Sequence, residues 1–208
     1  MPIDYKKTQK QLYHPKTTPA VIDVPEMVFI MVDGTGNPNT SDDYKSALEI
    51  LYGLSYTIKM SNKSILEYVV PPLEGLWWLN DGSENWHEDK SKYCWTSMIR
   101  QPEFVDIAVF ESAKAALAKK KPNLDTSRTR LETLTEGLCV QAMHIGSYDE
   151  EPRTNAAIAK YMSDNGYVSD IGDSRRHHEI YLNDPRKTVP EKLKTIIRHT
   201  VRLAHGGF

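Results

Sequence analysis

The pattern of apolar and polar residues predicts a strand and then a helix near the start of the chain. Residues 26–33 (EMVFIMVD) are a short β-rich run, which predicts a strand. A helix is predicted from Thr40 to about Lys59, because Thr40 is a good N-cap and two aspartates follow in the first turn. One face of that helix is traced by Tyr44, Leu48, Leu51, Ser55 and Ile58.

The rest of the first half predicts further strands and a second helix. Residues 65–70 and 76–79 resemble one strand that two consecutive prolines interrupt, so a bend or bulge is expected there. Residues 93–100 (YCWTSMIR) predict another strand. The second helix is expected to begin at Pro102, to run into a triple lysine that complements the helix dipole, and to stop at Pro122.

The second half of the chain repeats this order of elements. A helix is expected at Pro152, directly after three acidic residues, and Gly166 ends it. The strands expected around it are residues 131–134, 136–146, 177–182 and 195–203, with one helical turn at 190–192. The two halves share this order without obvious sequence identity.

Two halves with the same order of elements predict an α+β fold. We expect duplicated β-α-β-β units with an antiparallel sheet, helices on one face and a central ligand cleft. Residues 1–23 are polar and contain prolines, so an extended N-terminal arm is expected there. Residues 24–208 are expected to form one domain of two pseudo-repeats, about 24–122 and 123–208, because a polar linker follows the second helix.

Composition narrows the class of protein. The chain has 208 residues, 39% hydrophobic and 26% charged, which is typical of a globular protein with a core. Its net charge of −2, without a basic stripe, argues against direct nucleic-acid binding. We expect a cytoplasmic protein that does not enter membranes, because the chain lacks a signal-peptide pattern and an apolar run of spanning length. The two cysteines fit free thiols, and the sequence does not indicate an oligomeric state.

The segment HHEIYL at residues 177–182 carries the first candidate for chemistry. Side chains alternate along a strand, so Ile180 and Leu182 share one face, which we expect the helices to cover. Glu179 and Tyr181 then point to the other face. There the carboxylate is suited to pair with a cationic ligand or to act as a general base. On alternation alone, a solvated glutamate on an open sheet face remains the favoured interpretation.

Aromatic residues and one histidine are further candidates. All four tryptophans fall between Trp77 and Trp95. Adjacent Trp77 and Trp78 must point to opposite faces of a regular strand, so one suits a stacking wall and the other the core. The alternative is that most of the tryptophans are core residues. His144 ends a strand just before a turn; it either orients a ligand or hydrogen-bonds the turn, and the structural role is favoured.

The sequence does not indicate a metal site or a cofactor. It contains neither HExxH nor CxxC, and adjacent histidines such as His177 and His178 point apart on a strand. A GxSxG nucleophile elbow and a GxGxxG phosphate loop are also absent. We therefore expect no metal and no cofactor.

Several segments taken together resemble the GyrI-like small-molecule-binding domain. MHIGSYDEEP (143–152) is similar to the His-x-Gly-x-Tyr turn of that family, and HHEIYLNDP (177–185) to its Glu-Ile-Tyr-Leu strand. The resemblance runs from about Val24 to Leu203, and further segments look like a standalone bacterial branch that resembles cyclopropanoid hydrolases. The further matching segments are LSYTIKM (54–60), YVVPPLEGLWW (68–78), MIRQPEF (98–104) and PEKLKTIIRH (190–199).

The resemblance implies a ligand and a set of site residues. It places Glu179 in a central cleft, where related drug-sensing regulators meet cationic aromatic compounds. Those regulators carry a DNA-binding domain, for which we see no room before Val24, so a transcription-factor role is not expected. The standalone branch is similar to proteins that hydrolyse cyclopropane-bearing, DNA-alkylating natural products. The resemblance thus implies a detoxifying hydrolase whose partner is an aromatic small molecule.

The residue roles follow from this comparison and from residue chemistry. Glu179 is expected to act as the base, with Tyr181 as a second catalytic group; either Tyr181 or Tyr148 supplies a hydrogen bond to the ligand. The residues expected to contact the ligand are Tyr68, Trp78 and Trp95 as stacking walls, with Met143, His144 and Tyr148. The main alternative is a protein that binds or sequesters aromatics without chemistry, and a weaker one is a protein-interaction role such as protection of gyrase.

Overall fold

The computed structural model describes residues 1–81 and 89–204, and the chain divides into two compact units. Unit 1 comprises Met1–Asp4 and Met27–Leu134, and unit 2 comprises Tyr5–Glu26 and Thr135–Phe208. Each unit contains a strand, a helix and two further strands in that order, within an antiparallel sheet. The expected α+β class with duplicated β-α-β-β units is therefore confirmed.

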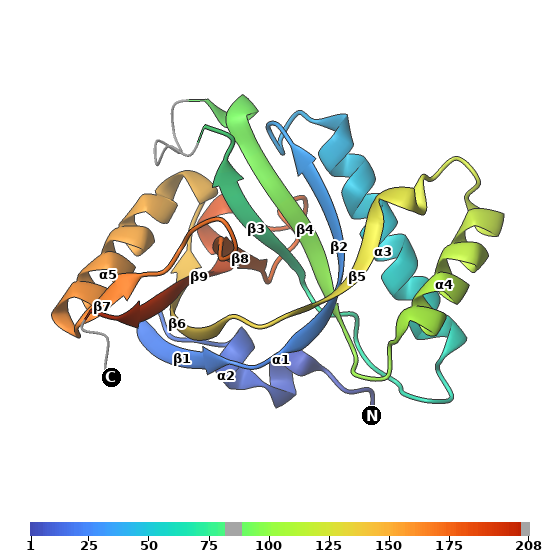
Figure 1. Ribbon diagram of the computed structural model, residues 1–208, viewed down its shortest axis with the longest axis horizontal. Coiled ribbons are helices and arrows are strands. Elements are labelled where there is room, and N and C mark those ends of the chain that lie inside the picture. The colour runs from blue at the N-terminus through green and yellow to red at the C-terminus, as the bar shows by residue number, and fades with distance from the viewer. Residues whose placement is uncertain (82–88, 205–208) are drawn as a thin grey trace. The chain divides into compact units, whose positions relative to one another are not determined.

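Unit 1 is a four-stranded antiparallel sheet with two helices, α3 and α4, packed against each other (Figure 1). Its strands lie in the order β3-β4-β2-β5. The elements are β2 (Met27–Thr35), α3 (Asp42–Ser61), β3 (Leu73–Leu79), η1 (Lys90–Lys92), β4 (Tyr93–Gln101), α4 (Ile107–Lys120), η2 (Thr126–Arg128) and β5 (Thr129–Leu134).

Helix α3 begins one residue later than a Thr40 cap predicts. Ser41 is the N-cap, and its hydroxyl accepts a hydrogen bond from the backbone N–H of Tyr44. The buried face carries residues at helical spacing, which include Ala47, Leu51, Leu54 and Ile58. The second helix also begins later than expected, at Ile107, where the Asp106 side chain caps it by accepting from the Val109 N–H.

The face of the unit 1 sheet that meets α3 carries Trp77 and Trp95. These two residues are cross-strand partners on β3 and β4, so they share a face. Tyr44 of α3 packs against both rings, with centroid distances of 6.0 Å to Trp77 and 5.0 Å to Trp95. Trp78, one position further along β3, consequently points to the opposite face of the sheet.

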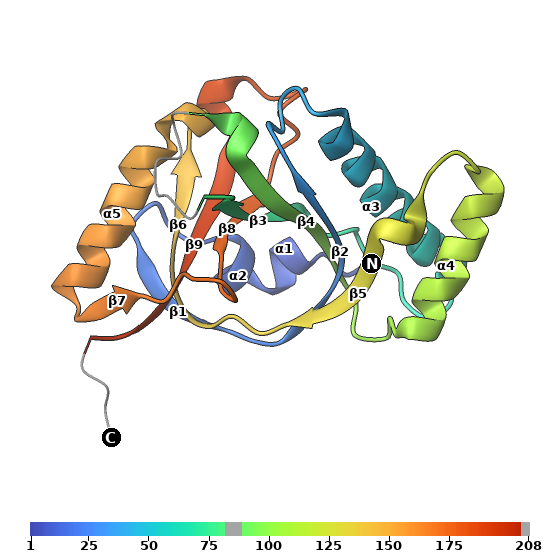
Figure 2. The ribbon, with the colours of Figure 1, turned by 45° about the horizontal axis from the view of Figure 1, so that its top comes forward.

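Unit 2 contains a four-stranded path, β1-β6-β9-β8, and a short strand β7 that pairs with β9. Helix α5 lies along β6 and β9 (Figure 2). The elements are α1 (Tyr5–Thr8), α2 (Lys10–Tyr13), β1 (Ala20–Val24), β6 (Gly137–Ile145), η3 (Tyr148–Glu150), α5 (Glu151–Asp164), β7 (Tyr167–Ser169), β8 (His177–Tyr181), η4 (Pro190–Lys192) and β9 (Lys194–Leu203).

The two faces of the unit 2 sheet pack against different parts of the unit. On one face, Ile197 of β9 belongs to an apolar core with Ile158 and Met162 of α5. On the other face, buried Arg198 donates hydrogen bonds to Glu136 and to the backbone carbonyl of Leu12, which joins the N-terminal segment to the sheet. Each face of this sheet is therefore covered by part of unit 2.

Three expectations about the fold are corrected. Residues 1–23 are not an extended arm: they form two short helices and most of β1, because β1 pairs with β6 along its length. Residues 65–70 are not a strand and contribute only an isolated bridge from Tyr68 to Ile3. The boundary between units falls at Leu134–Thr135 rather than near residue 122, because β5 pairs with β2 of unit 1. Trp86 lies outside the described residues.

Candidate functional site around Glu179

Glu179 lies on the face of the unit 2 sheet that carries α5. Its cross-strand partner is Ile197, which packs in the core with α5, and cross-strand partners share a face. The expectation that the helices cover the Ile180 face and leave Glu179 on the other is therefore wrong for α5. The reason is that Ile180 is buried on the face to which Arg198 and the N-terminal segment pack.

Three side chains of β8 form a row on this face: His177, Glu179 and Tyr181. They are two residues apart, so the pleat of the strand directs them the same way. The Glu179 carboxylate is largely buried, with 13% of its side chain exposed. The largely buried carboxylate of Glu179 therefore lies between the imidazole of His177 and the phenol of Tyr181.

The carboxylate of Glu179 is held at both oxygens. The Tyr181 hydroxyl donates to Oε2 at 2.7 Å, and Nε2 of His177 lies 3.0 Å from Oε1. A carboxylate oxygen has two lone pairs, so each oxygen retains one after these contacts. The group is thereby fixed in orientation and can still accept a hydrogen bond from a water molecule or a ligand.

His177 is itself supported from behind by His199 of β9. Nδ1 of His177 lies 2.8 Å from Nε2 of His199, and the two rings meet edge to face at a centroid distance of 4.9 Å. Burial, and then the neighbouring His177, lower the pKa of His199 to about 3. His199 is therefore neutral at physiological pH, with one nitrogen that donates and one that accepts.

Tyr148 stands beside this row, at the start of the one-turn helix η3. Its ring meets the ring of Tyr181 edge to face, with centroids 6.0 Å apart. Burial, and then the negative charge of Glu179, raise the pKa of Tyr148 to about 12. The phenol consequently keeps its proton at physiological pH and is available as a hydrogen-bond donor.

The turn that carries Tyr148 is tightly held. Gly146 adopts a φ of 142°, and a Cβ there would lie 2.5 Å from a carboxylate oxygen of Glu150. Ser147 and Glu150 form a capping box, in which the Glu150 side chain accepts from the Ser147 N–H. The His-x-Gly-x-Tyr pattern therefore encodes a rigid turn.

His144 is part of the support of this turn. Its Nε2 lies 2.9 Å from the Ser147 carbonyl oxygen, and its Nδ1 lies 2.8 Å from the hydroxyl of Thr154 in α5. A carbonyl oxygen only accepts, so Nε2 carries a proton and donates to it, while Nδ1 pairs with the hydroxyl. Both ring nitrogens are thus engaged with the protein, and His144 joins β6, η3 and α5.

Met143 lies on the opposite face of the unit 2 sheet from Glu179. Its partner on β9 is Ile196, whereas Glu179 is opposite Ile197. Met143 lines a surface hollow of about 390 Å³ together with Ile145, Lys194 and residues 14–18. The sheet separates this hollow from the Glu179 row, so the structure does not bring Met143 to the other site residues of unit 2.

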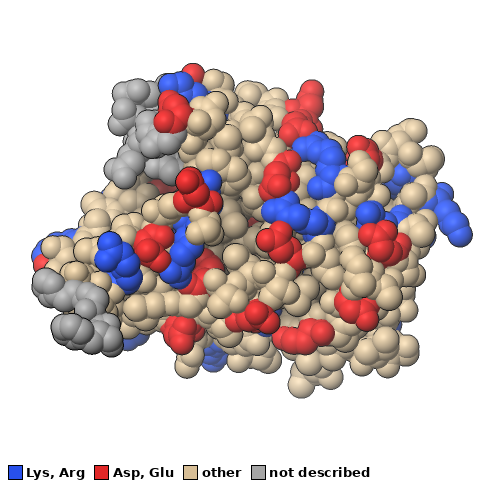
Figure 3. Space-filling model, viewed as in Figure 1, with Lys and Arg blue, Asp and Glu red and all other residues tan. Residues whose placement is uncertain are grey.

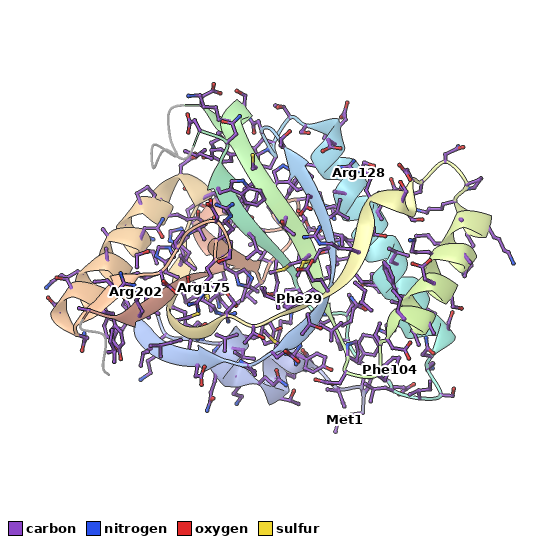
Figure 4. All side chains as sticks on the ribbon, viewed as in Figure 1. Met1, Phe29, Phe104, Arg128, Arg175 and Arg202 are labelled. Atoms are coloured by element: carbon purple, nitrogen blue, oxygen red, sulfur yellow. The ribbon has the colours of Figure 1, made fainter. Side chains whose placement is uncertain are left out.

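The expected site residues of unit 1 fall in three different places. Trp95 is fully buried against α3, and Tyr68 is buried with its ring against Phe104, which is labelled in Figure 4. Trp78 is partly exposed on the face of the sheet opposite Trp95. The unit 1 sheet therefore does not present Trp78 and Trp95 on one wall, and the ligand contacts of all three remain predictions.

Charge near Tyr148 is negative. After burial and Glu179, the pKa of Tyr148 is raised further by Glu151 and Asp184. Elsewhere, on the face shown in Figure 3, Lys and Arg are interspersed with Asp and Glu among the described residues.

Within residues 1–81 and 89–204, no group of three His, Cys, Asp or Glu side chains is arranged to hold a metal ion. In the same ranges, no helix is long and apolar enough to cross a bilayer.

His177 and His199 belong to the candidate site, and the sequence patterns did not single them out for it. Alternation contained the signal for His177, because it is two residues before Glu179 on the same strand. His199 is 22 residues away from His177 and meets it only through the pairing of β8 with β9. The sequence had no local signal for that pair.

Comparison with known proteins adds a family and several relatives. The GyrI-like small molecule binding domain matches residues 17–201. An uncharacterized conserved protein from Listeria innocua is 47% identical, with a TM-score of 0.92 over 96% of this chain and all of that one. A hydrolase from Listeria innocua is 46% identical, with a TM-score of 0.88 over 96% of this chain and all of the other.

A further solved structure has a similar fold at much lower sequence identity. The C-terminal domain of EcmrR is 11% identical, with a TM-score of 0.54 over 89% of this chain and 97% of that domain. At this identity the likeness concerns the fold alone. No curated protein matches the chain.

Proposed function

Because the chain belongs to the GyrI-like small-molecule-binding family, we propose that it binds planar aromatic small molecules beside Glu179 and hydrolyses electrophilic, cyclopropane-bearing compounds. The observation that carries the proposal is the carboxylate of Glu179, held at both oxygens next to a phenol that keeps its proton. Similarity to a hydrolase from Listeria innocua, which spans nearly the whole chain at 46% identity, supports a reaction of this class.

Binding rests on flat aromatic surface and negative charge. Tyr181 contacts the carboxylate and its ring meets the ring of Tyr148, and aromatic side chains supply large, flat contact area for a planar ligand. The negative charge at the site favours ligands that carry a cationic or strongly polarised edge. Trp78, Trp95 and Tyr68 remain proposed contacts, as does His144, whereas Met143 is left out because it lies on the other face of the unit 2 sheet.

The proposed reaction adds one water molecule to the strained ring. Glu179 takes a proton from the water, and the oxygen forms a bond to a ring carbon while a ring C–C bond breaks. The electron pair moves into the conjugated carbonyl oxygen, which takes a proton from solvent, and Glu179 returns its proton to solvent. The ring is already electrophilic, so one oriented base and one ordered water suffice.

We assign different roles to the two tyrosines in this proposal. The Tyr181 hydroxyl donates to Glu179 and therefore positions the base. The donor to the carbonyl oxygen of the ligand is then Tyr148, whose raised pKa makes it a hydrogen-bond donor rather than an acid. Tyr181 thus orients the base, and Tyr148 stabilises the negative charge that develops on the ligand.

The test is turnover of a cyclopropylindole-type alkylator, with the ring-opened product followed by mass spectrometry. The wild type is expected to form product beyond one equivalent, and Glu179→Gln is expected to lose at least about 100-fold in rate. Glu191→Gln, at an exposed glutamate in the same unit, is the matched control and is expected to keep full activity.

Two outcomes would overturn parts of the proposal. Saturable binding of the alkylator without product would show a sequestering protein instead of an enzyme. Unchanged binding and turnover in Glu179→Gln would show that the site lies elsewhere. A phosphate-buffered reaction without protein supplies the uncatalysed rate against which both results are read.

A further inference from the structure

The carboxylate that the proposed reaction uses as a base has a second anchor besides Tyr181. His177 contacts one carboxylate oxygen of Glu179 through Nε2, and its other ring nitrogen contacts His199. Both histidines are largely shielded from solvent, and the side chain of His177 is only 11% exposed. A partly buried imidazole with both nitrogens engaged cannot turn without breaking two hydrogen bonds.

The partners determine which way each hydrogen bond points. An ionised carboxylate only accepts, so Nε2 of His177 carries a proton and donates to Glu179. Neutral His199 is able to donate its Nε2 proton to Nδ1 of a neutral His177, or to accept from a His177 that carries both protons. In either case the donation from His177 to Glu179 is preserved.

Position on the strands explains why this pair is formed. His177 lies directly opposite His199, next to the paired residues His178 and Arg198, so the two rings meet across β8 and β9. His177 also lies on the same face as Glu179, two residues before it. The pairing of β8 with β9 thereby places the donor, His177, next to the carboxylate of Glu179 and places His199 next to His177.

We propose that His177, held by His199, is a positioning residue for Glu179: it donates Nε2–H to one carboxylate oxygen and so keeps the free lone pairs of the base aimed at the attacking water. This inference rests on the proposed hydrolysis. If it holds, the rate of hydrolysis depends on a hydrogen-bond donor at the position of Nε2, and a side chain other than imidazole that supplies this donor also supports the reaction.

Two substitutions at His177 separate donation from simple filling of space. In His177→Gln the longer side chain brings an amide N–H to the place of Nε2, whereas in His177→Asn the amide reaches only the place of Nδ1. We expect His177→Asn to lower kcat about 10- to 100-fold with little change in KM, a loss typical of groups that orient a reacting group. His177→Gln is expected to recover most of that loss.

The same logic applies to His199, whose Nε2 meets His177. His199→Gln retains an amide at that place, so it is expected to lower kcat less than His199→Asn does. Ring-nitrogen NMR of the wild type, labelled with 15N-histidine, is expected to show a proton on Nε2 of His177. Thermal unfolding of each variant shows which of them are folded.

The outcomes separate this inference from the proposed function. If the wild type does not turn over the alkylator, the proposed function is overturned and the positioning role with it. If the wild type turns over and folded His177→Asn matches it in kcat, only the positioning role is overturned. If neither His177 variant folds, an Nε2 of His177 without a proton in the wild-type spectrum overturns the inference.

Discussion

At the scale of single residues, Tyr181 is held in two ways at once. Its hydroxyl donates to Glu179, and its ring meets the ring of Tyr148 edge to face. The phenol therefore links the charged group of the site to the aromatic surface beside it. The two functions are separable, because removal of the hydroxyl leaves the ring in place.

Tyr181→Phe is expected to slow turnover while it leaves most of the stability intact. The lost hydrogen bond costs about 1.5–3 kcal/mol if the acceptor is fully charged and less if water replaces the phenol. We expect a decrease of roughly 10-fold in kcat from the less ordered base, measured by product formation. Tyr56→Phe, at an exposed tyrosine of α3, is the control. Full activity of Tyr181→Phe would remove Tyr181 from the site.

Gly34 is a second residue at which the addition of one carbon atom is expected to change the stability of the protein. An added Cβ would lie 2.2 Å from two ring carbons of Trp95, which is fully buried. Gly34→Ala is therefore expected to destabilise the protein by about 1–3 kcal/mol, because the ring has no room to yield. Chemical denaturation measures the effect. Gly172→Ala, where a Cβ meets nothing within 4 Å, should be close to neutral.

At the scale of elements, β8 separates two polar networks onto its two faces. His177 and Glu179 lie on the α5 face, whereas His178 meets Glu136 on the other. Glu136 also accepts from Arg198, and Arg175, labelled in Figure 4, donates to the Glu136 backbone carbonyl. One network thus belongs to the candidate site and the other ties β6, β8 and β9 together.

Loss of charge at Glu136 is expected to destabilise this group of strands. Glu136→Gln would leave Arg198 and His178 buried without their anion, and such a change costs about 3–5 kcal/mol. Urea unfolding measures the difference. Lys160→Gln, which removes an exposed ion pair with Asp164, is expected to cost less than about 1 kcal/mol. Equal effects of the two changes would contradict a structural role for the buried network.

At the scale of the whole molecule, acid is expected to lower stability over a wide range. Burial and His177 lower the pKa of His199 to about 3, so the unfolded chain binds its proton first as the pH falls below about 6.5. Burial alone would raise the pKa of Glu136, but His178 and Arg198 overcome this and hold it at about 2. The unfolded glutamate therefore also takes up a proton first, below about pH 4.5.

Both shifts have the same sign: in each window the unfolded state binds more protons, so the free energy of unfolding decreases as pH decreases. The contribution of His199 is fully present above its unfolded pKa and is lost between about pH 6.5 and 3; that of Glu136 is lost between about pH 4.5 and 2. Unfolding free energies measured from pH 7 to 4 should fall, and His199→Gln should flatten the curve above pH 5. An unchanged slope would contradict the assignment for His199.

The sequence by itself determined the α+β class, the strand–helix–strand–strand order within each half and the residue types at the candidate site. These follow from local rules: β-rich runs form strands, apolar residues recur at helical spacing in α3 and α5, and Glu179 and Tyr181 share a face of β8 by alternation alone. The failures were also local, since the polar composition of residues 1–23 concealed the pairing of β1 with β6.

Only the tertiary structure decided what surrounds Glu179. Alternation says that two faces differ but not which one a helix covers, and strand pairing places Glu179 opposite Ile197 on the α5 face. The pairing of β8 with β9 also brings His199 to His177, and the pairing of β3 with β4 places Trp78 and Trp95 on opposite faces of the unit 1 sheet. These contacts join residues that are distant in sequence, so strand register and packing determine them, and no local pattern encodes them.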